Sequence, residues 1–537
     1  MPDLLLRAAT VIDGTGADRY RADVTIDADG RIDEIGHGLT ARRTIDADGL
    51  VLAPGFIDLH AHSDLNLLVE PDHPSRITQG VTLDVLGQDG LSYAPVDDIA
   101  LVALRRQLAG WNGDPDDFDW NWRTVAQYLD RLDGGIGAHA CYLAPHGTIR
   151  TLAMGWDNRP PTEDELDRMR ALLDQALADG AVGMSTGLTY TPGMYADTAE
   201  LVELCRLVAA RGGYHAPHQR SYGAGALEGY AEMVEISRRS GCPLHLTHAT
   251  MNFGVNEGRA GEFLALVDSA LADGIDVTLD SYPYLPGSTT LAALLPSWAT
   301  EGGPEATLGR LADPAARDRI RTDVEEHGSD GCHGVVTDWG TIQISGVRNT
   351  ALTAVVGRKI SELAAEQGRT GTEVFFGLLL ADQLGTTILQ HVGHEGNVRA
   401  IMRHPAHTVG SDGLLVGARP HPRAWGTFPR YLAHYSRDLG VLTLEQAIAR
   451  MTGRPARRLR LDRRGLIRPG HHADLVLFDP ETVRDTATFD HPRRPAEGIA
   501  HVLLGGIAAL TDGKPTGDLA GRALRRDADG LVRAAGE

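Results

Sequence analysis

Hydrophobic and polar residues alternate over the first fifty positions of the chain. Short apolar runs at 8–14, 24–27, 31–35 and 44–47 are separated by glycine turns at 14–16 and 28–30. A period of two is typical of strands with one buried face. Because so short a segment buries little surface on its own, we expect residues 1–53 to need further strands from elsewhere.

β character returns near the other end of the chain, in the apolar runs 465–479 and 499–504. We expect these strands, within residues 456–537, to complete the N-terminal sheet as a small β-sandwich domain built from both chain ends. The tail beyond about residue 512 is charged and rich in Gly and Ala, so we expect it to pack loosely.

Between residues 54 and 455 the pattern changes to strand, loop and helix. Thr162 and Glu165 form a predicted capping box before a helix with a 3.6-residue apolar period. Strands that alternate with helices form a parallel sheet. Eight apolar runs follow this pattern: one that ends near residue 60, then 80–86, 138–143, 180–185, 213–218, 243–248, 276–282 and 407–412.

Eight such units predict an α/β fold, a (β/α)8 TIM-like barrel whose functional groups lie at the carboxyl ends of the strands. An open, doubly wound sheet is the alternative. The stretch from about 285 to 405 is too long for a loop and contains helical patterns at 354–367 and 373–384. We interpret it as an insertion between strands seven and eight, near the active mouth.

Polar residues gather where these strands end. His60 and His62 are two residues apart and would point to the same side of a strand, although an H-x-H pair alone is a weak signal. The other strand ends supply an aspartate or histidine each, and the full set is His60, His62, Asp89, His218, His248 and Asp412. Four imidazoles and two carboxylates at one barrel mouth predict a site for one or two divalent metal ions.

Charge and cysteine content exclude several classes of function. Fifty-one Lys and Arg against 72 Asp and Glu give a net charge of −21, which disfavours nucleic acid and anionic membranes as partners. The four cysteines are scattered, without a C-x-x-C pair, and the N-terminus has neither a signal peptide pattern nor a long apolar stretch. We therefore expect a cytoplasmic protein that acts on a small molecule; its oligomeric state is not indicated.

The chain resembles the amidohydrolase superfamily and, within it, the N-acyl-D-amino-acid deacylase (D-aminoacylase) family. The resemblance covers about residues 4 to 510, and its motifs occur in the family's order. They are Pro54–Asp64, Gly80–Thr82, Ser92–Pro95, His146–Arg150, Gly187–Gly193, His218–Arg220, Tyr282–Tyr284, Gly410–Gly413, His421–Arg423 and Gly426–Arg430.

The resemblance implies a role for each site residue. His218 and His248 would hold a tightly bound zinc ion with a third ligand from strand two, and His60, His62 and Asp412 would frame a second position. Asp412 would be the general acid and base. Four further residues are expected to bind the substrate, and Arg423 among them would pair with the amino-acid carboxylate; the four are Tyr190, Arg220, Tyr282 and Arg423.

Two positions depart from the family pattern. Where the family usually has cysteine on strand two, this chain has Asp89 within Gly87–Gly90. Asp89 is interpreted as a ligand, with a turn aspartate before Gly90 as the alternative; as a hard oxygen donor it would also admit Mn, Fe or Co beside Zn. Thr250 stands where the family usually has lysine, which removes one cationic partner for a substrate carboxylate.

Lysine is nearly absent from the chain, at positions 359 and 514 only. Some amidohydrolases bridge two metals with a carboxylated lysine on a barrel strand, and no predicted barrel strand here carries a lysine. We therefore expect a metal-dependent hydrolase that cleaves the amide bond of N-acyl-D-amino acids or related N-acyl compounds. The alternatives are another carbon–nitrogen hydrolase, such as a deaminase or a specialised natural-product amidase, and an inactive scaffold protein.

Overall fold

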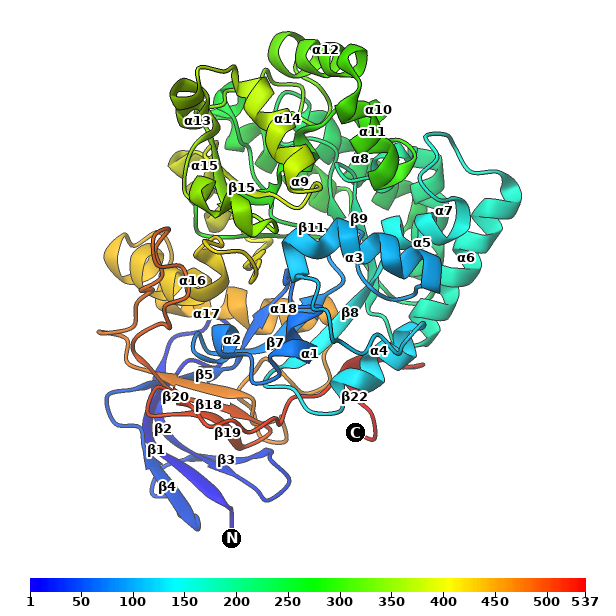
Figure 1. The fold of residues 1–537 in the computed structure, drawn as a ribbon. Helices are drawn as coiled ribbons and strands as arrows, with labels where there is room; N and C mark the ends of the chain where they lie inside the picture. Colours follow the sequence, from blue (N-terminus) through cyan, green and yellow to red (C-terminus); the bar gives the residue numbers. More distant parts are fainter.

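The computed structural model describes residues 1–537, and eight parallel strands form its centre (Figure 1). They pair in the order β16-β12-β11-β10-β9-β8-β7-β6. The two edge strands meet beyond their ends, where Ala61 forms a parallel bridge with Gly413 and the Asp412 amide donates to the His60 carbonyl at 2.8 Å. The sheet is therefore a closed barrel, which confirms the expected fold and excludes an open sheet. Its strands are β6 (Phe56–Asp58), β7 (Val81–Leu86), β8 (His139–Pro145), β9 (Gly183–Gly187), β10 (His215–His218), β11 (Leu244–Leu246), β12 (Val277–Ser281) and β16 (His407–Val409).

Helices follow most barrel strands and cover the outside of the barrel. The longest, α6, begins with the expected capping box, in which the Thr162 hydroxyl accepts from the Glu165 amide and the Glu165 carboxylate accepts from the Thr162 amide. The barrel strands and helices share a core of 57 buried residues. The helices are α1 (Asn66–Val69), α2 (Pro74–Ile77), α3 (Asp98–Asn112), α4 (Val125–Leu132), α5 (His146–Met154), α6 (Glu163–Ala178), α7 (Thr198–Ala210), α8 (Ala226–Ser240), α9 (Ala260–Ala272), α15 (Glu395–Arg403), α16 (Arg423–Arg430), α17 (Leu444–Met451) and α18 (Gly453–Leu459).

Both chain ends contribute to one nine-stranded sheet beside the barrel (Figure 1). Its order is β20-β19-β18-β17-β5-β1-β2-β3, with β4 paired to β1. Along β17, Leu475 and Leu477 pack with the N-terminal strands, whereas Val476 and Phe478 belong to the core shared with the barrel side. The strands are β1 (Leu4–Val11), β2 (Tyr20–Ile26), β3 (Ile32–Gly36), β4 (Arg43–Asp46), β5 (Val51–Pro54), β17 (Leu475–Phe478), β18 (Ile499–Leu504), β19 (Ile507–Thr511) and β20 (Lys514–Pro515).

The segment between β12 and α15 adds a separate layer at the end of the barrel away from the β domain (Figure 1). It has a core of 19 buried residues and a three-stranded antiparallel sheet in the order β13-β15-β14. The helical pattern at 354–367 becomes a 3-10 turn (Thr350–Val355) followed by α13. The elements are β13 (Gly287–Thr290), α10 (Ser297–Thr300), α11 (Gly303–Ala312), α12 (Pro314–Thr322), β14 (Ile342–Gly346), α13 (Ile360–Gln367), α14 (Gly371–Ala381) and β15 (Thr387–Gln390). Helix α15 packs against α9, β12 and β16, so it belongs to the barrel wall.

Residues 512–519 of the C-terminal tail are exposed, whereas residues 521–534 are packed, so the expectation of a loose tail was wrong for this second part. Strands β21 (Leu524–Arg526) and β22 (Val532–Ala534) form a hairpin, and Ala523, Leu524 and Val532 are fully buried. Ala523 also bridges to Ala140 of β8. A few apolar residues within a polar segment are sufficient here because they join the core around β6, β7 and β8. No helix combines the length and apolar character needed to span a bilayer.

Candidate metal centre

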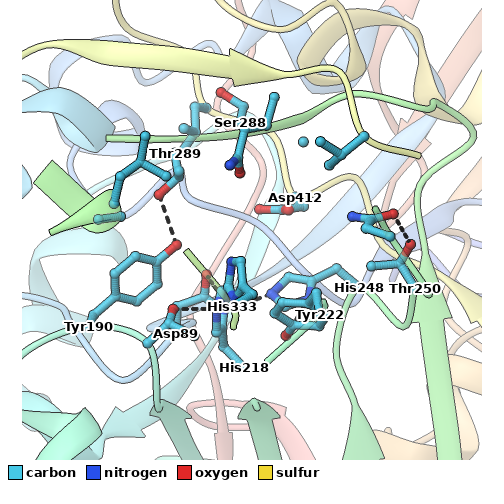
Figure 2. A pocket seen from close by; sticks show the side chains of 18 of the residues that line it. Asp89, Tyr190, His218, Tyr222, His248, Thr250, Ser288, Thr289, His333 and Asp412 are labelled. Atoms are coloured by element: carbon cyan, nitrogen blue, oxygen red, sulfur yellow. Dashed lines mark hydrogen bonds and ion pairs between the residues drawn. The ribbon is translucent and has the colours of Figure 1, made fainter. Parts of the chain in front are cut away.

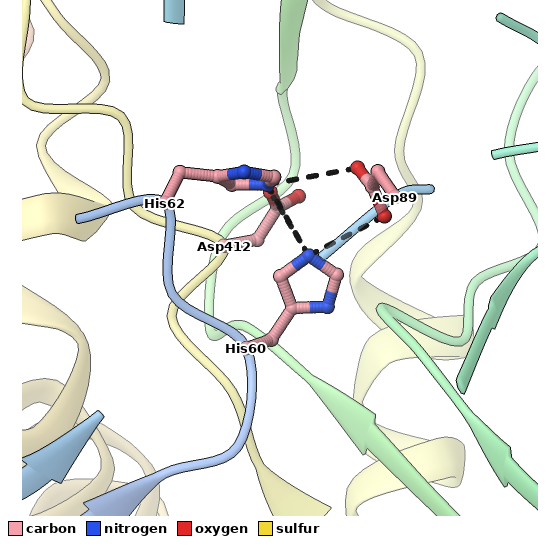
Figure 3. Close-up of side chains that lie close together, drawn as sticks. All are labelled: His60, His62, Asp89 and Asp412. Carbon is pink, nitrogen blue, oxygen red and sulfur yellow. Dashed lines mark hydrogen bonds and ion pairs between the residues drawn. The ribbon is translucent and has the colours of Figure 1, made fainter. Parts of the chain in front are cut away.

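The six predicted ligands lie together at the carboxyl ends of the barrel strands, and all are buried. His60 and His62 follow β6, and Asp89 follows β7 by three residues. His218 ends β10, His248 lies two residues past β11, and Asp412 lies three residues past β16. Figure 3 shows His60, His62, Asp89 and Asp412 pointing toward one another from these separate elements.

The first group of donor atoms has the spacing of a coordination shell. The Nε2 atoms of His60 and His62 are 3.3 Å apart, and the His62 Nε2 atom lies 3.2 Å from Asp412 Oδ1. Both Asp89 oxygens lie 3.6 Å from one of these imidazoles. A tetrahedral ion with bonds of 2.0–2.1 Å separates its ligands by about 3.3–3.5 Å. The four side chains therefore fit one divalent ion.

Asp89 also belongs to a second group. Its Oδ2 atom lies 3.4 Å from the His218 Nδ1 atom, and its Oδ1 atom lies 3.4 Å from the His248 Nε2 atom. One carboxylate thus lies between four imidazoles, at the junction of two possible ion positions. This placement favours the ligand interpretation of Asp89 over the turn-aspartate alternative.

The backbone at three of these residues adopts the left-handed region, which is uncommon for residues other than glycine. The φ angles are 55° at Asp89, 32° at His248 and 49° at Asp412. Such conformations cost about 1–3 kcal/mol each and persist where the surroundings fix them. Backbone strain at three predicted ligands, each just beyond a different barrel strand, is typical of a preorganised functional site.

Neighbouring polar groups orient the imidazoles. Asp280 of β12 accepts a hydrogen bond from the His248 backbone amide at 2.8 Å, and its Oδ2 atom lies 3.9 Å from the His60 Nδ1 atom. The Tyr222 hydroxyl lies 3.0 Å from the Nδ1 atom of His248, and the Thr189 hydroxyl lies 2.7 Å from the Nε2 atom of His218. Partners of this kind fix ring orientation and raise ligand basicity. The sequence interpretation missed Asp280, although it lies in the carboxyl-terminal half of barrel strand β12.

Burial and charge set opposite pKa shifts within the cluster. Burial lowers the pKa of His60 to about 4. Burial alone would also lower the pKa of His62, but its hydrogen bonds to Asp412 and Asp89 raise it to about 10. For Asp412, burial opposes ionisation, yet the Arg423 guanidinium and His62 hold the pKa of its carboxyl well below the usual range. Asp412 is therefore a carboxylate at neutral pH.

Arg423, at the start of α16, lies behind Asp412. It is fully buried, its Nη2 atom is 2.9 Å from Asp412 Oδ2, and its guanidinium lies 4.4 Å from the centre of the Tyr282 ring. Its Nε and Nη1 atoms have no hydrogen-bond partner in the protein. Arg423 thus fixes one oxygen of Asp412 and keeps two donors free.

Arg220 lies away from the cavity, contrary to the sequence-based expectation of a substrate contact. Its guanidinium binds the Glu232 carboxylate at 2.6 Å and donates to the carbonyls of Met194 and Ala196. Strand β10 ends at His218, so the strand alternation that would place Arg220 beside His218 no longer applies. Arg220 instead joins α8 to the loop after β9.

The cluster opens into a cavity of about 760 Å³, including its mouth. Figure 2 shows Asp89, His218, His248 and Asp412 in this cavity, with Tyr222 beside His248 and Tyr190 on one side of the cluster. Predicted residues Tyr190 and Tyr282 line the cavity, as does Thr250, whose hydroxyl donates to Asn252 at 2.7 Å. No lysine or arginine lines it. His333 and Trp111 also line it and were missed, because they come from the insertion and from α3, where no strand end marks them.

Comparison with known proteins agrees with the fold and the geometry of the site. The model of the amidohydrolase family matches residues 43–508. D-aminoacylase of Alcaligenes xylosoxydans xylosoxydans is 36% identical over 98% of both chains, and the N-acyl-D-glutamate deacylase of the same organism is 36% identical over 98% of this chain and 97% of its own.

Solved structures agree with these sequence matches. A D-aminoacylase crystal structure has a TM-score of 0.82 at 36% identity and covers 98% of this chain and 100% of its own. The N-acyl-D-glutamate deacylase of Bordetella bronchiseptica, complexed with zinc and a phosphonate mimic of the tetrahedral intermediate, has a TM-score of 0.81 at 34% identity, with 98% and 99% covered. With matches over nearly its whole length and a barrel that ends in a His and Asp cluster, this chain belongs to the amidohydrolase family.

Proposed function

We propose that this protein is a metal-dependent hydrolase that cleaves the amide bond of N-acyl-D-amino acids to a carboxylate and a free amine. The observation that supports it most strongly is the placement of Asp89 among four imidazoles, opposite Asp412, in a cavity of small-molecule size. The relatives named for D-aminoacylase and N-acyl-D-glutamate deacylase activity match over the full chain. These facts together favour this reaction over the other functions considered.

The donor set suits zinc. Two carboxylates and four imidazoles surround a small buried volume, with donor spacings close to the edges of a zinc tetrahedron. The Asp89 oxygens also suit Mn, Fe or Co. His60, His62, Asp89 and Asp412 would hold one ion, and Asp89, His218 and His248 a second. When bound, such an ion lowers the pKa of a water from 15.7 toward about 7 and polarises the scissile carbonyl.

Asp412 is proposed as the general acid and base. Its Oδ2 atom is held by Arg423, whereas its Oδ1 atom faces the imidazoles at 3.2 to 3.6 Å. The Asp412 carboxylate would accept a proton from the attacking water. The same carboxyl then delivers that proton to the leaving nitrogen, which completes the exchange.

We propose that Arg423, Tyr190 and Tyr282 contact the substrate. The two free donors of Arg423 suit a carboxylate, and access to them would run past the Tyr282 ring that covers the guanidinium. Tyr190 and Tyr282 both line the cavity. The four cysteines are buried and unpaired, which suits the reducing cytoplasm that we propose as the location.

A second candidate is hydrolysis of another carbon–nitrogen bond on the same scaffold. It is favoured by the absence of lysine and arginine from the cavity lining and by Thr250, which is hydrogen-bonded to Asn252. A substrate without a free carboxylate would need no cationic partner there. Deamination releases ammonia, whereas deacylation releases a carboxylic acid.

A substrate screen tests both candidates. N-acetyl-D- and N-acetyl-L-amino acids are incubated with the purified protein after loading with Zn, Mn, Fe or Co, and free amine and free ammonia are assayed separately. The proposal predicts release of the D-amino acid. Release of ammonia without any deacylation would favour the second candidate, and no product from any substrate would contradict both.

A further inference from the structure

A second cavity lies beside the catalytic one and has no role in the mechanism above. Its volume is about 760 Å³ including its open mouth, and it lies between α3, the loop after β9 and the insertion. Most of its lining is apolar, with Leu108, Met194 and Leu295 among the side chains. The one charged residue that lines it, Arg106, pairs with Glu305 of α11. Five threonines and Gln107 supply the remaining polar side chains, so a charged ligand would find no unpaired counter-charge inside.

The two cavities adjoin along shared lining residues. Four residues line both of them, namely Trp111, Thr189, Tyr190 and Ala293. The Tyr190 ring lies 4.8 Å from the His218 ring on one side and 4.8 Å from the Trp111 ring on the other. Its hydroxyl is held by Thr289 at 3.0 Å, as Figure 2 shows. One aromatic side chain thus lies between a metal-ligand imidazole and the second cavity.

We propose that the second cavity binds the aliphatic acyl chain of the substrate, so that the preferred substrates carry acyl groups longer than acetyl. This inference rests on the proposed function. An acyl substituent that extends from the scissile carbonyl past Tyr190 enters apolar surroundings, and the rest of the substrate stays in the catalytic cavity beside the His and Asp cluster. Hydrolysis breaks the amide C–N bond, adds hydroxide to the acyl carbon and a proton to nitrogen, and yields a fatty carboxylate and a free amine.

The expected gain follows from burial of methylene groups. Each buried CH₂ contributes about 0.8 kcal/mol, which corresponds to about a fourfold rise in kcat/KM per added methylene until the cavity is full. A substrate site confined to the catalytic cavity would instead show a decline beyond short chains, because Tyr190 and Trp111 would obstruct them. kcat/KM should therefore rise with acyl chain length if the second cavity binds the chain, and fall if the substrate is confined to the catalytic cavity.

The test compares acetyl, butyryl, hexanoyl and octanoyl derivatives of one D-amino acid. Ala292 lines the second cavity only, so Ala292→Phe fills it. The matched control, Ala306→Phe, lies on α11 within the same insertion, is also partly buried and lines neither cavity. We expect kcat/KM of the wild type and of Ala306→Phe to rise with chain length, and the octanoyl-to-acetyl ratio of Ala292→Phe to fall toward one. Circular dichroism verifies that both variants fold.

Different results would contradict the acyl-chain site and the proposed function. Turnover of the acetyl substrate with a flat or falling chain-length dependence would overturn the acyl-chain site and leave the proposed function intact. An unchanged ratio in Ala292→Phe would also overturn it. Tryptophan fluorescence with added octanoate gives an independent reading, because Trp111 and Trp156 line the cavity; an emission change in the wild type that Ala292→Phe loses supports the proposal. Failure of every acyl substrate, including acetyl, would contradict the proposed function itself.

Discussion

Replacing Asp412 with Asn is expected to remove activity and to destabilise the protein for separate reasons. The carboxamide keeps the shape of the side chain but cannot accept the water proton, so kcat/KM should fall by about 10²–10⁴-fold. It also leaves buried Arg423 without a counter-charge 2.9 Å away. The Coulomb energy at that distance is about 6 kcal/mol with an effective dielectric constant of 20. Desolvation offsets part of it, and breaking a buried pair costs about 3–5 kcal/mol.

The double variant Asp412→Asn/Arg423→Met separates the two effects. Removing the uncompensated guanidinium should restore much of the unfolding free energy, measured by chemical denaturation, without restoring turnover. The single variant should be the least stable of the three proteins. Turnover of Asp412→Asn within tenfold of the wild type would refute its role as the base. Equal stability of the single variant and the wild type would refute the assigned ion pair.

Three further results are expected. Tyr222→Phe removes the hydroxyl beside His248 and should lower metal affinity or kcat/KM about 10- to 100-fold in a titration with zinc; no change would mean that the contact does not orient the ring. Arg464, with His139, holds the pKa of buried Asp474 well below its usual range against the opposing effect of burial. Its stabilisation is therefore present above the unfolded pKa of about 3.9 and is lost as pH falls through the lower folded value, so the denaturation midpoints of wild type and Arg464→Met should differ at pH 6 and converge in strong acid. Burial raises the pKa of Cys141 to about 12, so a thiol reagent at pH 8 should label it only after unfolding.

The regular parts of the fold were predictable because they depend on local pattern. The eight strand runs and the capping box of α6 follow from apolar periodicity and from the chemistry of Thr162. The predicted ligands lie together because parallel barrel strands all present their carboxyl ends at one mouth. The predicted ligands, such as His60 and His248, lie at or just after the ends of barrel strands. Their position in the sequence was therefore sufficient to predict that they lie close together.

The remaining features depend on contacts that no local pattern encodes. His333 reaches the cavity from a loop of the insertion, and Trp111 from the last turn of α3, so neither follows a barrel strand. Arg220 follows a strand end, but a carboxylate on a neighbouring helix takes its guanidinium. The tail is packed because a few apolar residues such as Leu524 complete a core formed by distant strands. In each case the position of the side chain depends on residues that are distant in the sequence.

The central claim is that Asp89 and the histidines around it hold a divalent ion. The most direct measurement is the zinc-to-protein ratio, determined by mass spectrometry after zinc loading and removal of free ion by gel filtration. We expect at least one ion per chain in the wild type and a clear loss in folded Asp89→Ala, since this change removes the carboxylate that both ligand groups share. A wild-type protein that retains no ion, or an Asp89→Ala variant that retains as much as the wild type, would contradict the account.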